Sequence, residues 1–219
     1  MFKELNKRIF STIILIPFSF YFIIQGSLFF NFFMLVCFLI TSNEWYKMSK
    51  SKNYLFFGYL FLSFSFYSTY ELRNTDIMGS SLYIFFFILI ICISTDIGGY
   101  VFGKILKGPK LSKVSPKKTY SGTIGGYFLS IISTYILINY SEIFFSIYVE
   151  FTIEIFICIL LISTVSQIGD LAISYFKRLS KIKDTGNIIP GHGGLLDRID
   201  GMIFAFPFSY VLFSLNILK

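Results

Sequence analysis

Long apolar runs, each followed by a short polar segment, recur along the whole chain and limit the folds that it can adopt. The runs are residues 9–24, 28–41, 54–70, 82–102, 123–138, 155–176 and 202–218. A helix needs about 20 apolar residues to cross a bilayer, within a range of about 17–25. Most of the runs reach or approach that length. The pattern therefore predicts an all-α, polytopic membrane bundle of about seven transmembrane helices.

The composition agrees with a membrane protein. Hydrophobic residues make up 55% of the 219 residues and charged residues 14%, whereas a soluble domain carries about 25% charged residues. We find no internal repeat and no second domain, so residues 1–219 are predicted to form a single integral membrane domain. The second run is followed by Asn-Glu-Trp-Tyr at 43–46, which is typical of an aromatic anchor at the membrane interface.

The Lys and Arg residues predict the orientation of this bundle. If the N-terminus is cytoplasmic, all of them except Arg73 and Lys219 fall on the cytoplasmic side. This asymmetry is expected from the positive-inside rule. The positive charges that give the net charge of +7 lie between apolar runs, so we expect a lipid bilayer and a phosphate-bearing substrate as partners, and no nucleic acid. The glycine-containing stretch 98–106 could instead form a re-entrant or surface helix.

Two acids lie inside apolar runs, where a carboxylate has no structural need. Asp170 comes about two helical turns before Lys177, roughly 10 Å below the membrane surface, and Asp96 lies roughly 12 Å before Lys104. A charge at the centre of a span costs about 2.5–3.5 kcal/mol, so each acid needs a cation, a partner or a water-filled cavity. The alternative for both is a buried ion pair or a neutral acid bonded to the backbone.

A polar stripe starts at Asp170. On a continuous helix, Asp170, Ser174, Lys177, Arg178 and Lys181 would share one face. The stripe begins with an acid inside the bilayer and ends with cations at its surface. This geometry suits a site that holds a metal below and phosphates above. The alternative is a basic flank that contacts lipid headgroups.

A glycine-rich turn and two further acids follow. The run Ile-Pro-Gly-His-Gly-Gly at 189–194 stops any helix and lets backbone N–H groups approach an anion. Asp197 and Asp200 come next, spaced to face the same side of a helix. They would repel each other unless a cation bridges them, and hard divalent cations prefer carboxylate oxygens. Together with Asp170 they are metal candidates, although acids also favour helix N-termini. His192, the only histidine, is a candidate general base or phosphate donor, or a hydrogen-bonding residue.

A basic loop at 103–126 is the candidate partner of these acids. Ser115, Lys117, Lys118 and Thr119 offer two ammonium groups and two hydroxyls just before a predicted span. Such a loop can neutralise a triphosphate, although many lysine-rich loops only set topology. The catalytic part is therefore expected mainly within residues 96–201.

The residues from Ser174 to Asp200 resemble the signature of phosphatidate cytidylyltransferases, also called CDP-diacylglycerol synthases. The resemblance is carried by Ser174, Lys177, Arg178, Lys183, Asp184, Gly186, Ile189, Pro190, His192, Gly193, Gly194, Leu195, Asp197, Arg198, Ile199 and Asp200. The loop Ser-Pro-Lys-Lys-Thr-Tyr-Ser-Gly from residue 115 is similar to a second family motif, and residues 96–104 are similar to an earlier span and its exit. The second motif usually reads Lys-Lys-Thr-Trp-Glu-Gly, so this chain departs from it at Tyr120 and Ser121.

The resemblance implies an enzyme of phospholipid biosynthesis in a bacterial-type cytoplasmic (inner) membrane, with its active site facing the cytoplasm. It would condense CTP with phosphatidic acid to give CDP-diacylglycerol and pyrophosphate. The family uses Mg²⁺, with K⁺ as a second ion, and its metal ligands correspond to Asp170, Asp197 and Asp200. The sequence leaves undecided whether the protein forms a homodimer.

The remaining site residues follow from the same resemblance and from their charges. Lys177, Arg178 and His192 are expected to be catalytic, together with the three metal candidates. The phosphates of the substrates are expected to bind Ser115, Lys117, Lys118, Thr119, Ser174, Lys183 and Arg198. An ion-coupled membrane transporter is the alternative, with Asp96 and Asp170 as ion-pathway residues. That alternative does not explain why the glycine-rich turn and the two later acids lie together.

Overall fold

The computed structural model describes residues 2–75, 81–112, 114–191 and 193–215, and of residues 2–10 only the backbone. Helices form the regular structure of these ranges, apart from isolated β-bridges between Lys110 and Thr119 and between Ile189 and Gly193. The helices are α1 (Phe2–Gln25), α2 (Ser27–Ser49), α3 (Leu55–Asn74), α4 (Ser81–Leu106), α5 (Tyr120–Asn139), α6 (Ser141–Phe145), α7 (Ile153–Leu179), α8 (Leu196–Ile199) and α9 (Met202–Ser214). The predicted all-α class is confirmed for the described part of the chain.

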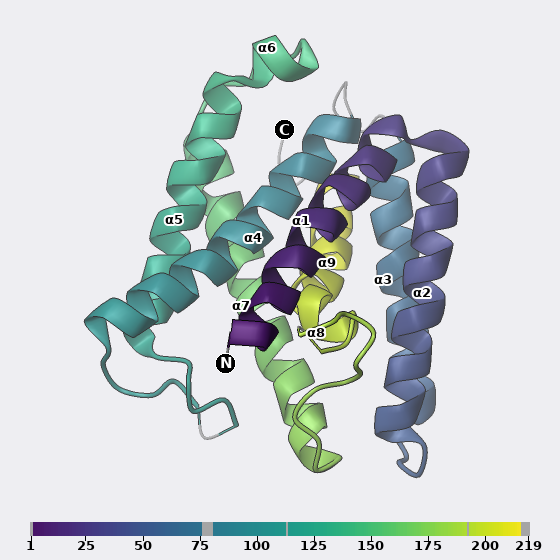
Figure 1. Ribbon diagram of the computed structural model, residues 1–219. Coiled ribbons are helices and arrows are strands. Elements are labelled where there is room, and N and C mark those ends of the chain that lie inside the picture. Colours follow the sequence, from purple (N-terminus) through teal and green to yellow (C-terminus); the bar gives the residue numbers. More distant parts are fainter. Residues whose placement is uncertain (1, 76–80, 113, 192, 216–219) are drawn as a thin grey trace.

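The long helices form one bundle, and several of the loops that connect them lie at a common end (Figure 1). The α2–α3 hairpin lies on one side of the bundle and α5 on the other, with α4, α7 and α9 between them. The beginning of α1, the loop at 50–54 and the described residues of the loops at 107–119 and 180–195 all lie at the lower end in this view. Residues that are far apart in the sequence therefore meet at that end.

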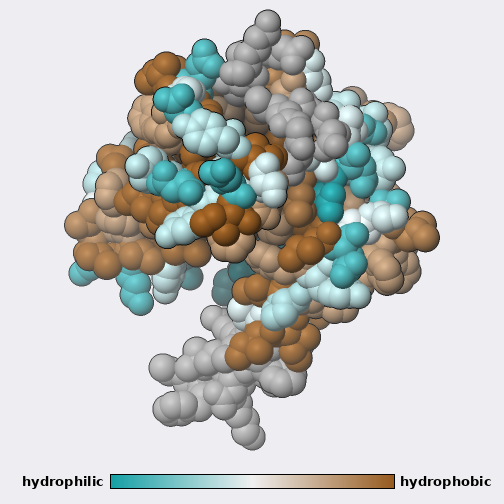
Figure 2. Space-filling view, turned by 90° about the horizontal axis from the view of Figure 1, so that it is seen from above, coloured by the Kyte–Doolittle hydropathy of each residue, from teal (hydrophilic) through white to brown (hydrophobic). Residues whose placement is uncertain are grey.

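Among the described residues, four helices are long and apolar enough to cross a membrane: α2, α4, α5 and α7. Two shorter apolar stretches, Ser11–Gln25 and Met202–Ser214, fall on other predicted spans. Many large apolar side chains on these helices are exposed, among them Phe32 at 62% and Ile124 at 68%. Figure 2 shows hydrophobic residues along much of the molecular rim, with hydrophilic ones interspersed on the upper end face. These surfaces suit contact with lipid.

Glycines allow α4 and α5 to pack closely, which fixes the loop between them. A Cβ atom at Gly98 would collide with the backbone oxygen of Gly125, and one at Gly122 would lie 2.6 Å from the backbone oxygen of Gly99. Small residues at such crossings let helix backbones approach each other within a membrane. The close pair holds the basic loop at the end of the bundle.

Two details differ from the alternatives that the sequence left open. The stretch 98–106 is neither re-entrant nor a separate surface helix, because α4 continues through it to Leu106. The polar stripe predicted on α7 is wrong at its end, because the helix stops at Leu179 and Lys181 has a left-handed φ of 55°. The backbone N–H of Lys181 then bonds to the oxygen of Arg178 at 3.0 Å, which turns the chain away from the helix axis.

Candidate functional site

Asp170 on α7 joins the acid-bearing helix to the basic loop. Its Oδ2 lies 2.6 Å from Nζ of Lys118, at the end of the α4–α5 loop, and both side chains are about one-quarter exposed. Its Oδ1 accepts a hydrogen bond from the hydroxyl of Ser174 at 3.3 Å. The structure thus brings together three residues that the sequence analysis assigned to two separate segments.

Asp200 faces the same place from the start of α9. It is only 7% exposed, and its Oδ1 accepts the backbone N–H of Gly201 at 2.9 Å. Burial raises the pKa of Asp200 well above its usual value, and the charges of Asp170 and Asp96 raise it further. Asp170 is also within hydrogen-bonding reach of Asp200. We call Asp96, Asp170, Asp200 and Lys118 the acid centre, because three carboxyl groups lie there close enough to influence one another.

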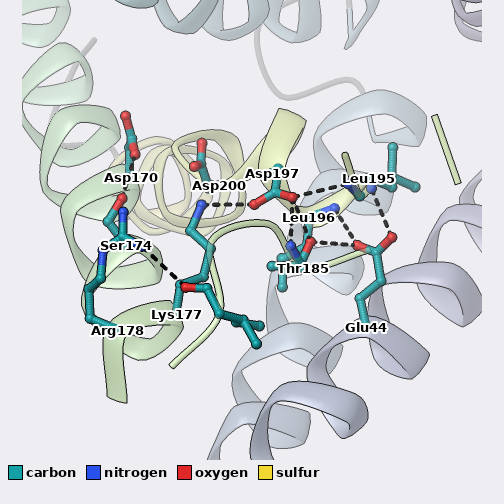
Figure 3. Close-up of polar contacts among 12 residues, drawn as sticks. Glu44, Asp170, Ser174, Lys177, Arg178, Thr185, Leu195, Leu196, Asp197 and Asp200 are labelled. Carbon is teal, nitrogen blue, oxygen red and sulfur yellow. Dashed lines mark hydrogen bonds and ion pairs between the residues drawn. The ribbon is translucent and has the colours of Figure 1, made fainter. Parts of the chain in front are cut away.

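Asp197 lies nearby, but its carboxylate serves other partners (Figure 3). Its Oδ1 accepts a hydrogen bond from Nζ of Lys177 at 2.8 Å. Its Oδ2 accepts the backbone N–H of Thr185 at 2.7 Å and that of Gly194 at 3.0 Å, and lies 3.0 Å from the Thr185 hydroxyl. Burial alone would raise the pKa of Asp197, but these bonds and the charge of Lys177 outweigh burial and lower it.

The predicted phosphate-binding residues are arranged around this end of the bundle. Thr119 caps α5, because its hydroxyl accepts the N–H of Gly122 at 3.1 Å. The carbonyl oxygen of Ser115 accepts the N–H of Lys118 at 3.0 Å, which folds the loop back on itself. Lys117 next to it is exposed.

The remaining predicted residues line the polar end of α7 and α8. Arg178 is exposed and donates to the backbone oxygens of Val114 at 3.5 Å and Ile182 at 3.2 Å, so it links α7 to the α4–α5 loop. Lys183 and Arg198 are also exposed. His192 lies outside the described residues.

The acid centre fits a divalent cation in part. Asp170 and Asp200 are close enough to repel each other, and a cation between them would remove that repulsion. Asp197, the third predicted ligand, is engaged with Lys177, Thr185 and Gly194. In the described ranges, no group of three His, Cys, Asp or Glu side chains has an arrangement that could hold a metal ion. The three-aspartate metal site stays a prediction.

Comparison with known proteins identifies the family of this chain. The model of the cytidylyltransferase family matches residues 69–216. The chain is 37% identical to the phosphatidate cytidylyltransferase of Rickettsia bellii (strain RML369-C) over 224 residues, which cover 98% of this chain and 91% of that protein. The chain belongs to the cytidylyltransferase family. The family's phosphatidate cytidylyltransferase from Bacillus subtilis (strain 168) is 37% identical over 157 residues, or 71% of this chain and 56% of that protein. The one from Staphylococcus aureus (strain COL) is 34% identical over 186 residues, or 83% and 66%.

The sequence analysis missed two residues that the structure places beside the family's motif. Glu44 on α2, interpreted there only as part of an interfacial anchor, is 1% exposed and accepts the backbone N–H groups of Leu195 and Leu196, where the segment after α7 meets α8. Thr185 in that segment contacts both Glu44 and Asp197. The reasoning applied to Asp170, that an acid beside an apolar run needs a partner, would have identified Glu44. Its position lies outside the matched residues 69–216.

Proposed function

We propose that this chain is a phosphatidate cytidylyltransferase of the cytoplasmic membrane, which converts CTP and phosphatidate to CDP-diacylglycerol and pyrophosphate. The names of its relatives support this function, and its apolar helices provide a surface for a lipid substrate. The contact between Lys118 and Asp170 carries the proposal. It joins a phosphate-binding loop to an acid-bearing helix at the end of a membrane bundle, where a soluble nucleotide and a lipid headgroup can meet.

The proposed reaction is an in-line displacement. A phosphate oxygen of phosphatidate attacks the α-phosphorus of CTP and forms a new P–O bond. The bond from the α-phosphorus to the oxygen that bridges to the β-phosphorus breaks, and pyrophosphate leaves with that electron pair. Because the nucleophile is already an anion, the enzyme contributes mainly positioning and charge neutralisation.

The basic side chains of both segments supply this neutralisation in the proposal. Lys118 approaches from the α4–α5 loop and Lys177 from α7. One of the three N–H donors of Lys177 goes to Asp197, which fixes the direction of the ammonium group and leaves donors for a phosphate oxygen. The exposed side chains of Arg178 and Lys183 are placed to bind the phosphates that reach farther into solvent.

Mg²⁺ is part of the proposal, with K⁺ as a second ion. Asp170 and Asp200 would hold the Mg²⁺, and Asp197 would join them if Lys177 released its Oδ1. When bound, the ion would supply Lewis-acid stabilisation of the phosphate oxygens. The repulsion between Asp170 and Asp200 supports this assignment.

The proposed topology has seven spans, a cytoplasmic N-terminus and an active site at the cytoplasmic surface. The common location of the start of α1, the α2–α3 and α4–α5 loops and the α7–α8 segment supports it. These segments carry most of the Lys and Arg residues, as expected for the cytoplasmic side.

The direct test is an assay of the purified full chain with CTP and phosphatidate in detergent micelles. We expect CDP-diacylglycerol and pyrophosphate to appear in equal amounts, to require both substrates, to stop with EDTA and to resume with excess Mg²⁺. Reaction without phosphatidate, or no product under any ionic condition, would overturn the proposed function.

A further inference from the structure

Glu44 is a buried carboxylate whose two oxygens both serve a distant segment of the chain. Its Oε1 accepts the backbone N–H of Leu195 at 2.9 Å, and its Oε2 accepts that of Leu196 at 2.7 Å. The hydroxyl of Thr185 lies 3.1 Å from Oε2. A buried carboxylate is stable only where such donors replace water, so the position of α2 and the position of this segment depend on each other.

Two glycines of the motif make room for this carboxylate. A Cβ atom at Gly186 or at Gly194 would lie 2.7 Å from Oε1 of Glu44, closer than real Cβ atoms approach other heavy atoms. A side chain at either position would have to push the carboxylate aside. The segment 185–196 and Glu44 therefore fit each other in shape, in addition to being joined by hydrogen bonds.

The same contacts continue to the proposed catalytic lysine (Figure 3). The hydroxyl of Thr185 lies between Oε2 of Glu44, at 3.1 Å, and Oδ2 of Asp197, at 3.0 Å. Asp197 in turn accepts the hydrogen bond from Lys177, which is 8% exposed. We call Glu44, Thr185, Asp197 and Lys177 the loop clamp. It connects α2, the segment after α7, α8 and α7 itself.

We propose that Glu44 is a positioning residue for the cytidylyl transfer. By holding Thr185, Leu195 and Leu196, it fixes the orientation of Asp197 and through it the ammonium group of Lys177. The N-terminal helices thus complete the site, although the match to the family covers only residues 69–216. The catalytic part of this inference rests on the role proposed above for Lys177, whereas the clamp itself does not.

The first test compares Glu44→Gln with Thr41→Val, a control on the same face of α2. Gln has a single acceptor oxygen, so it leaves one backbone N–H of the segment facing another donor. Among the described residues, Thr41 bonds to the backbone oxygens of Cys37 and Phe38 within its own helix. We expect Glu44→Gln to lower kcat on the order of 10-fold to 100-fold with little change in the KM for CTP. Thr41→Val should leave kcat unchanged.

The second test measures the clamp without using activity. Amide hydrogen exchange of the peptide 185–196 should become faster on the order of 10-fold in Glu44→Gln, and should not change in Thr41→Val. An unchanged exchange rate would overturn the clamp. Faster exchange with unchanged kcat would show a purely structural contact and overturn the positioning role. An inactive wild-type protein would refute the proposed function instead. The hydrogen-exchange rates would still test the loop clamp in that case, because they do not depend on activity.

A third pair keeps the inference falsifiable if Glu44→Gln does not fold. Thr185→Ser retains the hydroxyl between the two carboxylates, and Thr185→Val removes it at nearly constant volume. We expect kcat to stay near the wild-type value in Thr185→Ser and to fall in Thr185→Val, each normalised to folded protein. Equal kcat values in the two variants would overturn the connection from Glu44 to Asp197.

Discussion

The acid centre and the loop clamp lie next to each other, but their charges are compensated to very different degrees. In the loop clamp, Asp197 accepts hydrogen bonds from an ammonium group and two backbone N–H groups, and its pKa is lowered. In the acid centre, Asp200 accepts one backbone N–H, and its pKa is raised by burial and by the charges of Asp170 and Asp96. The two aspartates are only three residues apart in the sequence.

The difference separates carboxylates that hold the fold from those suited to hold a ligand. A carboxylate whose oxygens are all bonded contributes to stability, and its removal leaves its donors unpaired. A carboxylate crowded by like charges opposes folding until a cation arrives, so such groups are typical of functional sites. The comparison therefore predicts that similar substitutions in the two groups have different effects on activity and stability.

The largest effect is expected for Asp170→Asn. We expect it to lower CTP-dependent formation of CDP-diacylglycerol by more than about 100-fold, because a charged group that acts on the reacting phosphates is lost. Its melting temperature should stay close to that of the wild type, since the substitution removes both the ion pair with Lys118 and the repulsion from Asp200. Product formation and the unfolding of the same preparation are the two measurements.

Glu154→Gln is the matched control for that substitution. Glu154 lies in the first turn of the same helix, at the end opposite Asp170, and is exposed. It should retain wild-type activity. An active Asp170→Asn variant would remove the acid centre from the reaction and leave its crowded charges without a function.

The next effect is on stability, where Asp197→Asn and Asp200→Asn should act in opposite directions. Asp197→Asn breaks a buried ion pair with Lys177, at a cost on the order of 3 kcal/mol, so its melting temperature should fall by roughly 10 °C. Asp200→Asn keeps an acceptor for Gly201 and removes a repelled charge, so its melting temperature should rise by about 2–4 °C. Fluorescence of the single tryptophan, Trp45, measured in EDTA at pH 7, reports both transitions.

The pH dependence gives these variants a second, independent comparison. The pKa of Asp197 is lowered in the folded state, so its stabilisation is present above the ordinary carboxyl pKa of about 3.9 and is lost as the pH falls through the folded value. The pKa of Asp200 is raised, so its protonated form stabilises the fold at low pH, and that contribution is lost as the pH rises. Asp197→Asn should approach the wild type on acidification. A rise in melting temperature for Asp197→Asn at pH 7 would refute the assigned difference.

The sequence predicted the all-α class because long apolar runs favour helices, but in the described part of the chain only four helices are long and apolar enough to cross a membrane. The sequence also indicated that Asp170 needs a partner, because a carboxylate within an apolar run is costly. It did not predict the contact of Glu44 with Leu195 and Leu196, because those donors are backbone groups more than 150 positions away. Backbone donors are present in every residue, so a sequence pattern cannot reveal which of them a side chain will meet.

The extent of Asp197's role was missed for a related reason. Its spacing from Asp200 indicates a shared helical face but does not show which other groups reach each carboxylate. The answer depends on the turn after Leu179, where Lys181 takes a left-handed conformation and redirects the chain. That turn returns Thr185 to Asp197, and no periodic pattern marks it. The sequence thus named Asp170, Asp197 and Asp200 as candidates, but it missed Glu44 and Thr185, and the division into two groups required the structure.

The smallest expected effect separates two adjacent lysines, Lys117 and Lys118. The sequence gives them equal standing, but Lys118 is paired with Asp170 at 2.6 Å, whereas Lys117 is exposed. Lys118→Met should raise the apparent KM for CTP on the order of 10-fold, as expected for a partly buried charge on a phosphate. Lys117→Met should raise it by about 2-fold, because an exposed charge acts through solvent. Initial rates at varied CTP and fixed phosphatidate measure both. If the two variants had equal KM values, the acid centre would bind CTP no more directly than the surrounding basic surface does, and the pairing of Lys118 with Asp170 would serve the fold alone.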